Sequence, residues 1–81
     1  MLTIGNVLAL RRKELEITQK ELSLKTNISI VSLAKYEKGE RLPSYENLNK
    51  LAKALKLNYD EVSNILTNQK RSRKERINGN E

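Results

Sequence analysis

The sequence predicts an all-α protein of five short helices, and two features of the chain support this fold class. Leu, Lys and Glu, which favour helices, are abundant among the 81 residues, whereas only one proline and three glycines interrupt them. Several segments with apolar residues at helical spacing follow a Ser, Thr or Asn that can cap a helix. No internal repeat is visible, so we expect one small domain.

The first two helices are predicted from an apolar stripe and from a capping motif. The first helix runs from about Ile4 to Leu15 and carries its apolar residues on one side. The second begins at Thr18, whose hydroxyl can accept a hydrogen bond from the backbone N–H of Glu21. Because the Glu21 carboxylate can reach back to the Thr18 backbone, the pair forms a capping box.

The other three helices are predicted to begin at further capping residues. The third opens at Ser29 and ends at Gly39, which readily adopts the left-handed conformation that terminates helices. The fourth opens at Ser44 and the fifth at Asn58. The fourth has the clearest amphipathic stripe, made of Leu48, Leu51, Ala52 and Leu55.

The composition changes after Thr67. Residues 68–81 contain five basic and two acidic residues, and Ile77 is their only strongly apolar side chain. The sequence therefore predicts a folded domain over residues 1–67 and a basic tail over residues 68–81. The tail is either disordered or an extension of the last helix, and it serves either to bind phosphates or only to keep the protein in solution.

Composition also limits the classes of function. The chain has neither cysteine nor histidine, so it lacks thiolate ligands, disulfides and the commonest general base. We therefore expect no enzyme activity, no metal and no other cofactor. The formal net charge of +6 suits a polyanionic partner, although surplus lysines can also serve solubility alone. Because no apolar run approaches about 20 residues and no signal-peptide layout is present, we expect a cytoplasmic protein that does not bind membranes.

The segment from Thr18 to Lys38 has the layout of a helix-turn-helix. Asn27 stands where the chain must turn sharply, and asparagine tolerates the left-handed conformation better than most residues. Ile28 follows it as an apolar plug. The side chains expected to share one core are Leu22, Ile28, Leu33 and Tyr36.

The third helix places apolar residues on the side away from that core. Ile30 and Val31 lie opposite Leu33 and Tyr36 on a helical wheel, with Lys35 close by. One interpretation is a wide apolar face that packs against other helices. The other is a surface for the major groove of DNA, where apolar side chains contact thymine methyl groups and a lysine reaches guanine.

The residue pattern resembles the Cro/cI-type (XRE-like) helix-turn-helix family, which includes the lambdoid phage repressors. The resemblance covers about residues 4–66 and departs from the family at Glu16 and Asn27, where glycine is usual. Its matching positions at fixed spacing are Gln19, Leu22, Ser23, Ile28, Ser29, Leu33, Tyr36, Glu37, Gly39 and Pro43.

The resemblance implies a compact five-helix, lambda-repressor-like bundle with the helix-turn-helix at its second and third helices. It implies base contacts from Ser29, Ile30, Val31 and Lys35. It implies phosphate contacts from Gln19, Ser32, Lys38 and Arg41.

Two further sets of residues follow from the resemblance. Arg12 and Glu37 would form a partly buried ion pair between the first and third helices, unless Arg12 is an ordinary solvated arginine. The fifth helix would support a dimer, unless its apolar residues only close the core. Its candidate contacts are Val62, Ile65 and Leu66.

The function expected from these features is sequence-specific binding of double-stranded DNA. The protein would act as a homodimer on a palindromic operator and regulate transcription, as a repressor. The alternative is a protein-interaction module of antitoxin or anti-repressor type that uses the surface of the third helix. A weaker alternative is nonspecific packaging of nucleic acid, driven by net charge.

Overall fold

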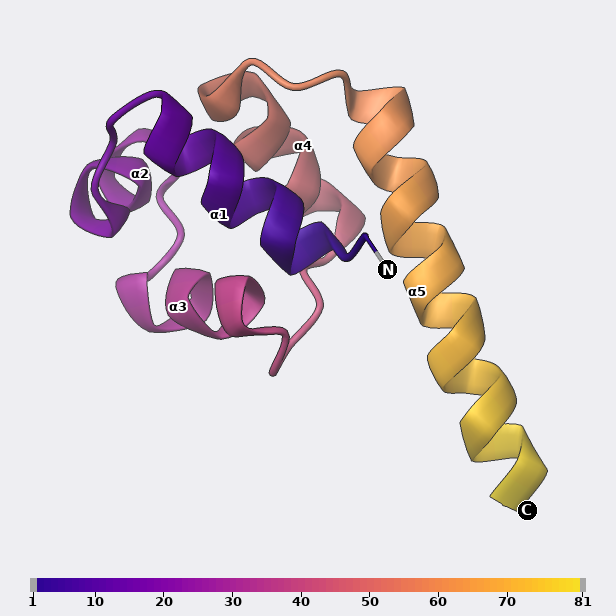
Figure 1. The fold of residues 1–81 in the computed structure, drawn as a ribbon. Helices are drawn as coiled ribbons and strands as arrows, with labels where there is room; N and C mark the ends of the chain where they lie inside the picture. Colours follow the sequence, from indigo (N-terminus) through magenta and orange to yellow (C-terminus); the bar gives the residue numbers. More distant parts are fainter. Residues whose placement is uncertain (1, 81) are drawn as a thin grey trace.

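A computed structural model describes residues 2–80, with side chains up to Ser72, and within this range it contains five helices and no strand. The predicted fold class is confirmed (Figure 1). The helices are α1 (Ile4–Glu14), α2 (Gln19–Thr26), α3 (Ile30–Lys38), α4 (Tyr45–Leu55) and α5 (Tyr59–Asn80).

Each helix begins at a capping side chain. Thr3, Thr18, Ser29 and Ser44 each accept a hydrogen bond from the backbone N–H three residues later. Asn58 caps α5 in the same way, because its Oδ1 accepts from the Glu61 N–H at 3.0 Å. The predicted helix starts at residues 18, 29, 44 and 58 are therefore confirmed, as is the capping box between Thr18 and Glu21.

Left-handed residues end three of the helices and shape one loop. Asn27, Gly39 and Lys56 cap α2, α3 and α4 with φ of 60°, 79° and 57°. Glu16, in the loop after α1, has φ of 57°. The two positions where the family usually has glycine, Glu16 and Asn27, thus hold conformations that glycine adopts without strain.

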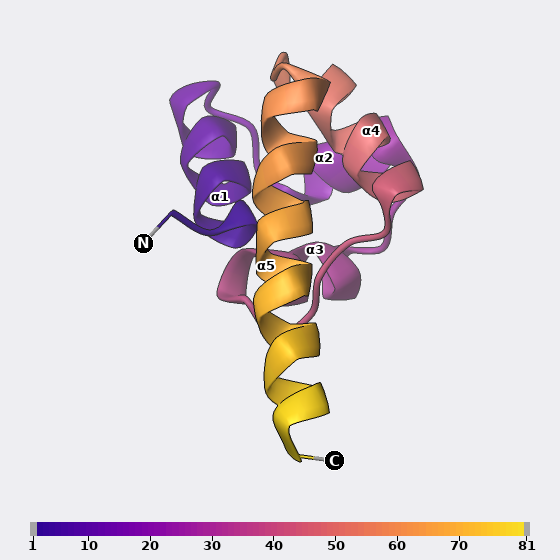
Figure 2. The same ribbon diagram turned by 90° about the vertical axis from the view of Figure 1, so that its right-hand side faces the viewer.

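The core lies where the five helices meet. In Figure 2, α5 crosses the molecule between α1 and α4, and it packs against both. Val62 and Leu66 of α5 are buried in this core, so they close it and are not free to contact a second copy. Of the three candidate dimer contacts, only Ile65 keeps part of its side chain exposed. The fully buried leucines are Leu8, Leu22, Leu33, Leu48, Leu51, Leu55 and Leu66.

The last helix continues beyond the expected domain boundary. α5 runs without a break through Thr67 to Asn80, which corresponds to the helical-extension alternative for residues 68–80. The Gln69 side chain accepts a hydrogen bond from the Ile4 backbone N–H. The Tyr45 hydroxyl is bonded to the Thr67 hydroxyl, and the Lys70 ammonium lies 4.3 Å from the centre of the Tyr45 ring. The first turn after Thr67 is therefore held against α1 and α4.

Two classes of feature are absent from the described part of the chain. None of its helices combines the length and the hydropathy needed to cross a membrane. No group of three or more acidic side chains in this part lies close enough together to hold a metal ion.

Candidate nucleic-acid interface

The outer face of α3 exposes apolar side chains. Ile30 and Val31 are 43% and 65% exposed, whereas Leu33 and Tyr36 on the opposite face are 2% and 4% exposed. Lys35 is also exposed on this helix. Ile30 and Val31 therefore do not belong to the core of this chain, and the alternative of a wide packed face does not apply to them.

A tight turn fixes α3 relative to α2. Asn27 supplies the left-handed conformation, and Ile28 is buried directly after it. The Ser23 hydroxyl donates to the Ile28 carbonyl at 2.6 Å, and the Thr26 hydroxyl donates to the Leu22 carbonyl at 2.8 Å. The sequence did not predict these two hydrogen bonds, because which carbonyl oxygen a hydroxyl reaches depends on the backbone conformation of the turn.

The first turn of α3 uses both of its serines. The Ser29 hydroxyl accepts from the Ser32 backbone N–H at 3.1 Å and donates to the Ser32 hydroxyl at 3.0 Å. Ser29 is exposed and Ser32 is partly exposed. The Ser29 hydroxyl thus caps α3. In a contact with a base, the same hydroxyl would have to form a further hydrogen bond or give up its bond to the Ser32 hydroxyl.

Arg12 and Glu37 form the expected ion pair between α1 and α3. Arg12 Nε and Nη2 donate to the two Glu37 carboxylate oxygens at 2.7 and 3.0 Å. Arg12 Nη1 also donates to the Ile17 carbonyl at 2.8 Å. The two side chains are only 13% and 10% exposed, so Arg12 is not a solvated surface residue.

Gln19 of α2 joins this pair, because its Nε2 donates to Glu37 Oε1 at 3.0 Å. The Glu37 carboxylate therefore links three helices. Burial raises the pKa of Glu37, but hydrogen bonds from Arg12 and Gln19 and the charge of Arg12 outweigh burial and lower it overall. The hydrogen bond to Glu37 is the main cause of the raised pKa of Arg12. Since one hydrogen of the Gln19 amide group is engaged here, its expected phosphate contact is left to the second amide hydrogen or to the backbone N–H.

Cations flank the outer face of α3. Lys38 at the end of α3 and Arg41 in the following loop are exposed. Neither forms an ion pair with another described side chain. Their charges are available to a polyanion that approaches α3.

The local geometry is that of a helix-turn-helix with an exposed second helix, and a family model described as helix-turn-helix matches residues 8–62. The chain belongs to the Cro/cI-type (XRE-like) helix-turn-helix family. This family consists of DNA-binding transcription regulators and not of enzymes.

Two curated relatives are transcription regulators. The transcriptional repressor RstR of the cryptic phage CTXphi from Vibrio cholerae is 46% identical over 55 residues, which are 68% of this chain and 49% of RstR. The regulator DicA from Escherichia coli is 43% identical over 54 residues, which are 67% of this chain and 40% of DicA. The chain thus spans half or less of the length of these relatives.

Two solved structures have a similar fold and cover most of this chain. The P22 c2 repressor, crystallised with a synthetic operator, has a TM-score of 0.72 and 34% identity, over 76% of this chain and 94% of its own. The restriction-modification controller protein C.AhdI from Aeromonas hydrophila has a TM-score of 0.68 and 27% identity, over 73% of this chain and 89% of its own.

A close approach of α1 to α3 positions the exposed helix of this Cro/cI-type domain. A Cβ atom added at Gly5 would lie 2.4 Å from the Tyr36 carbonyl oxygen and 3.1 Å from the Glu37 carbonyl oxygen. Only glycine lets the two backbones come this near. Sequence reasoning gave Gly5 no role, because nothing in the local pattern shows which helix crosses α1 at this point.

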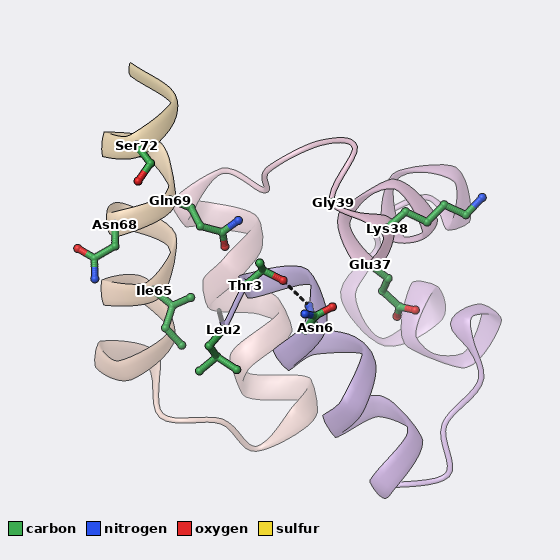
Figure 3. A pocket seen from close by; sticks show the side chains of 10 residues that line it. All are labelled: Leu2, Thr3, Asn6, Glu37, Lys38, Gly39, Ile65, Asn68, Gln69 and Ser72. Carbon is green, nitrogen blue, oxygen red and sulfur yellow. Dashed lines mark hydrogen bonds between the residues drawn. The ribbon is translucent and has the colours of Figure 1, made fainter. Parts of the chain in front are cut away.

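An open groove lies beside the helix-turn-helix. It has a volume of about 730 Å³ and separates the end of α3 from α5, with the start of α1 between them (Figure 3). Most of the residues that line it are polar, among them Thr3, Asn6 and Gln69, while Leu2 and Ile65 supply apolar contacts. Lys38 lines the groove but extends its side chain away from α5 in Figure 3.

Proposed function

We propose that this protein binds a specific sequence of double-stranded DNA as a homodimer on a palindromic operator and thereby represses transcription. The observation that carries the proposal is the outer face of α3. It presents exposed Ile30 and Val31 beside Lys35, on a helix whose opposite face is buried. This surface suits the major groove, where thymine methyl groups and guanine acceptors distinguish base pairs.

The surroundings of α3 support the proposal. The exposed cations Lys38 and Arg41, at and just after the C-terminal end of α3, suit phosphates beside a groove that α3 enters. The ion pair of Arg12 and Glu37 holds α3 against α1, so the reading surface is presented by a fixed element. Since both curated relatives come from bacteria, whose DNA lies in the cytoplasm, the proposal places the protein there. The role as a repressor is proposed from the relatives, of which RstR and P22 c2 are named repressors.

Selection of bound fragments from random duplex DNA tests this function. We expect the protein to enrich one motif with two inverted half-sites. Enrichment of no motif, with equal binding of all duplexes, would indicate nonspecific packaging and overturn the proposal. Absence of DNA binding would favour a protein partner for the face of α3.

A further inference from the structure

The extension of α5 beyond Thr67 projects past the DNA-reading face. In both Figure 1 and Figure 2 the C-terminal part of α5 runs beyond α3, on the side that faces away from α2 and α4. From Thr67 to Asn80 the helix adds about 20 Å at about 1.5 Å per residue. Since the major groove is only about 8.5 Å deep, a helix of this length extends alongside a duplex that α3 reads.

Contacts to two other helices set the direction of this extension. Gln69 accepts from the backbone N–H of Ile4 at the start of α1. On the other side, Tyr45 at the start of α4 is bonded to Thr67 and lies against the ammonium of Lys70. The first turn of the extension is thus held from both sides, and it cannot swing freely away from α3.

The extension carries an excess of positive charge. Between Lys70 and Arg76 the sequence has five basic residues and one acidic residue. Neither Lys70 nor Arg71 forms an ion pair with a described side chain. Lys70 is partly exposed and Arg71 is exposed, so both can reach a polyanion that lies beside α5.

We infer that the basic extension of α5 contacts the sugar–phosphate backbone next to the major groove that α3 reads. This inference rests on the proposed function. Contacts to phosphates carry no sequence information, so the extension adds affinity and salt dependence but no base preference. The binding surface of this protein is therefore larger than its helix-turn-helix.

The test compares two double variants of the full chain with equal loss of charge. Lys70→Gln/Arg71→Gln removes two charges from the extension, and Lys50→Gln/Lys53→Gln removes two from exposed positions of α4. Affinity is measured at several salt concentrations, and hydroxyl-radical footprints are recorded. For the extension variant we expect the slope of log affinity against log salt to become shallower by up to about 1.8, at about 0.9 per phosphate. Some backbone protections should disappear, while the preferred motif stays the same.

In the control variant, both the salt slope and the footprint should change less than in the extension variant. An equal change in both variants would show a general effect of charge and overturn the inference, and so would an unchanged slope in the extension variant. Circular dichroism checks that both variants fold.

The same measurements on a duplex of unrelated sequence separate this inference from the proposed function. If selection finds no motif, the proposed function fails. The phosphate contact is still supported if, on unrelated DNA, the slope of log affinity against log salt becomes shallower in the extension variant and not in the control. If a motif is found and the slope does not change, only the inference fails.

Discussion

Among the described side chains, Glu37 takes part in the most hydrogen bonds between helices. Its carboxylate accepts hydrogen bonds from Arg12 of α1 and Gln19 of α2, while its own backbone belongs to α3. Arg12 in turn binds the Ile17 carbonyl in the loop before α2. A single carboxylate thus sets how α3 lies against the two helices that support it.

Replacing Glu37 by Gln should therefore lower the stability of the fold. The change leaves the charge of Arg12 uncompensated at a site where the pair is only 13% and 10% exposed. Loss of one partner of a buried pair costs about 3–5 kcal/mol, and we expect the lower end because the amide still accepts one hydrogen bond. Glu14→Gln is the control, since it breaks the exposed Arg11–Glu14 pair and should cost about 0.5 kcal/mol or less. Thermal melts that show equal losses would contradict a structural role for Glu37.

The same carboxylate makes stability depend on pH. The pKa of Glu37 is lowered in the folded protein, so its contribution is complete above the unfolded value of about 4.3 and is lost as pH falls through the lower folded pKa. The wild type should therefore lose more thermal stability between pH 7 and pH 3 than Glu37→Gln does. Hydrogen bonds with Thr18 also lower the pKa of Glu21, but this effect is present in both proteins and cancels. If the wild type and Glu37→Gln lose equal thermal stability between pH 7 and pH 3, the prediction is wrong.

Readout by α3 can be tested at three residues. Ile30 and Val31 cannot form side-chain hydrogen bonds, so they can discriminate base pairs only by shape, through contact with a thymine methyl group or by exclusion of a polar base edge. Replacing thymine by uracil in the selected motif should weaken binding by the native protein but not by an Ile30→Ala/Val31→Ala variant. Leu24→Ala, at a 77% exposed position of α2, is the control and should keep the full effect of the methyl group.

Lys35→Ala should cost about 1–3 kcal/mol of binding free energy and relax the preference at one base pair. Lys38→Ala, in contrast, should weaken binding to all sequences alike. A uniform loss with Lys35→Ala would contradict its assignment to a base.

Much of the site at the residue scale was predictable from the sequence. The exposure of Ile30 and Val31 follows from helical spacing, because the position of the buried Leu33 and Tyr36 fixes the outer side of the helix. The bond between Gln19 and Glu37 was not predictable, because it joins two helices whose relative position depends on the whole core. Family resemblance assigned Gln19 to a phosphate, which did not indicate that its amide donor binds within the protein.

The crossing of α1 and α3 gives a prediction at the scale of elements. In a helix interior, Gly→Ala ordinarily stabilises by about 0.5–1 kcal/mol. At Gly5 the added Cβ would meet the Tyr36 carbonyl oxygen at 2.4 Å, and backbone atoms cannot turn aside as a side chain can. Gly5→Ala should therefore destabilise by about 1–3 kcal/mol. Asn6→Ala, at the exposed neighbouring position, should leave the melting temperature nearly unchanged. A more stable Gly5→Ala variant would show that the helices do not approach so closely.

Substitution by glycine should have opposite effects at the end of α1 and in the loop that follows it. Glu16 has φ of 57°, a conformation that costs a residue with a Cβ about 1–2 kcal/mol. Glu16→Gly should remove this strain and raise the midpoint of denaturant unfolding. Glu14 is the last residue of α1, so Glu14→Gly should lower the midpoint, by about 0.5–1 kcal/mol of stability. If both variants are destabilised equally, the left-handed conformation at Glu16 is not strained.

The starts of the helices were predictable because capping is local, involving a side chain and a backbone group three residues away. The length of α5, in contrast, was not predictable from the sequence. Residues 68–80 have almost no apolar side chains, and composition therefore did not distinguish a tail from a helix. The contacts that hold the first turn of the extension come from Ile4 and Tyr45, which lie 65 and 22 residues from their partners in the sequence.

At the scale of the whole molecule, one copy presents one reading helix. On the proposed function a single α3 would cover one half-site, so specific binding should require two copies on inverted half-sites with centres about 10 base pairs apart. Val62 and Leu66 are buried within each copy, which leaves Ile65 as the exposed member of the candidate contacts on α5. Sedimentation of the complex with the selected duplex should give two protein chains per duplex.

Spacing between the half-sites gives the sharper test of this assembly. Two copies in contact must meet both half-sites on the same face of the duplex, which repeats about every 10 base pairs. Inserting about 5 base pairs, half a helical turn, between the half-sites turns one of them to the opposite face. Binding should then fall to the level of a duplex with one half-site, because the second copy can no longer contact both its half-site and its partner. An unaltered affinity after the insertion, with one chain per duplex, would mean that the protein reads its motif as a monomer.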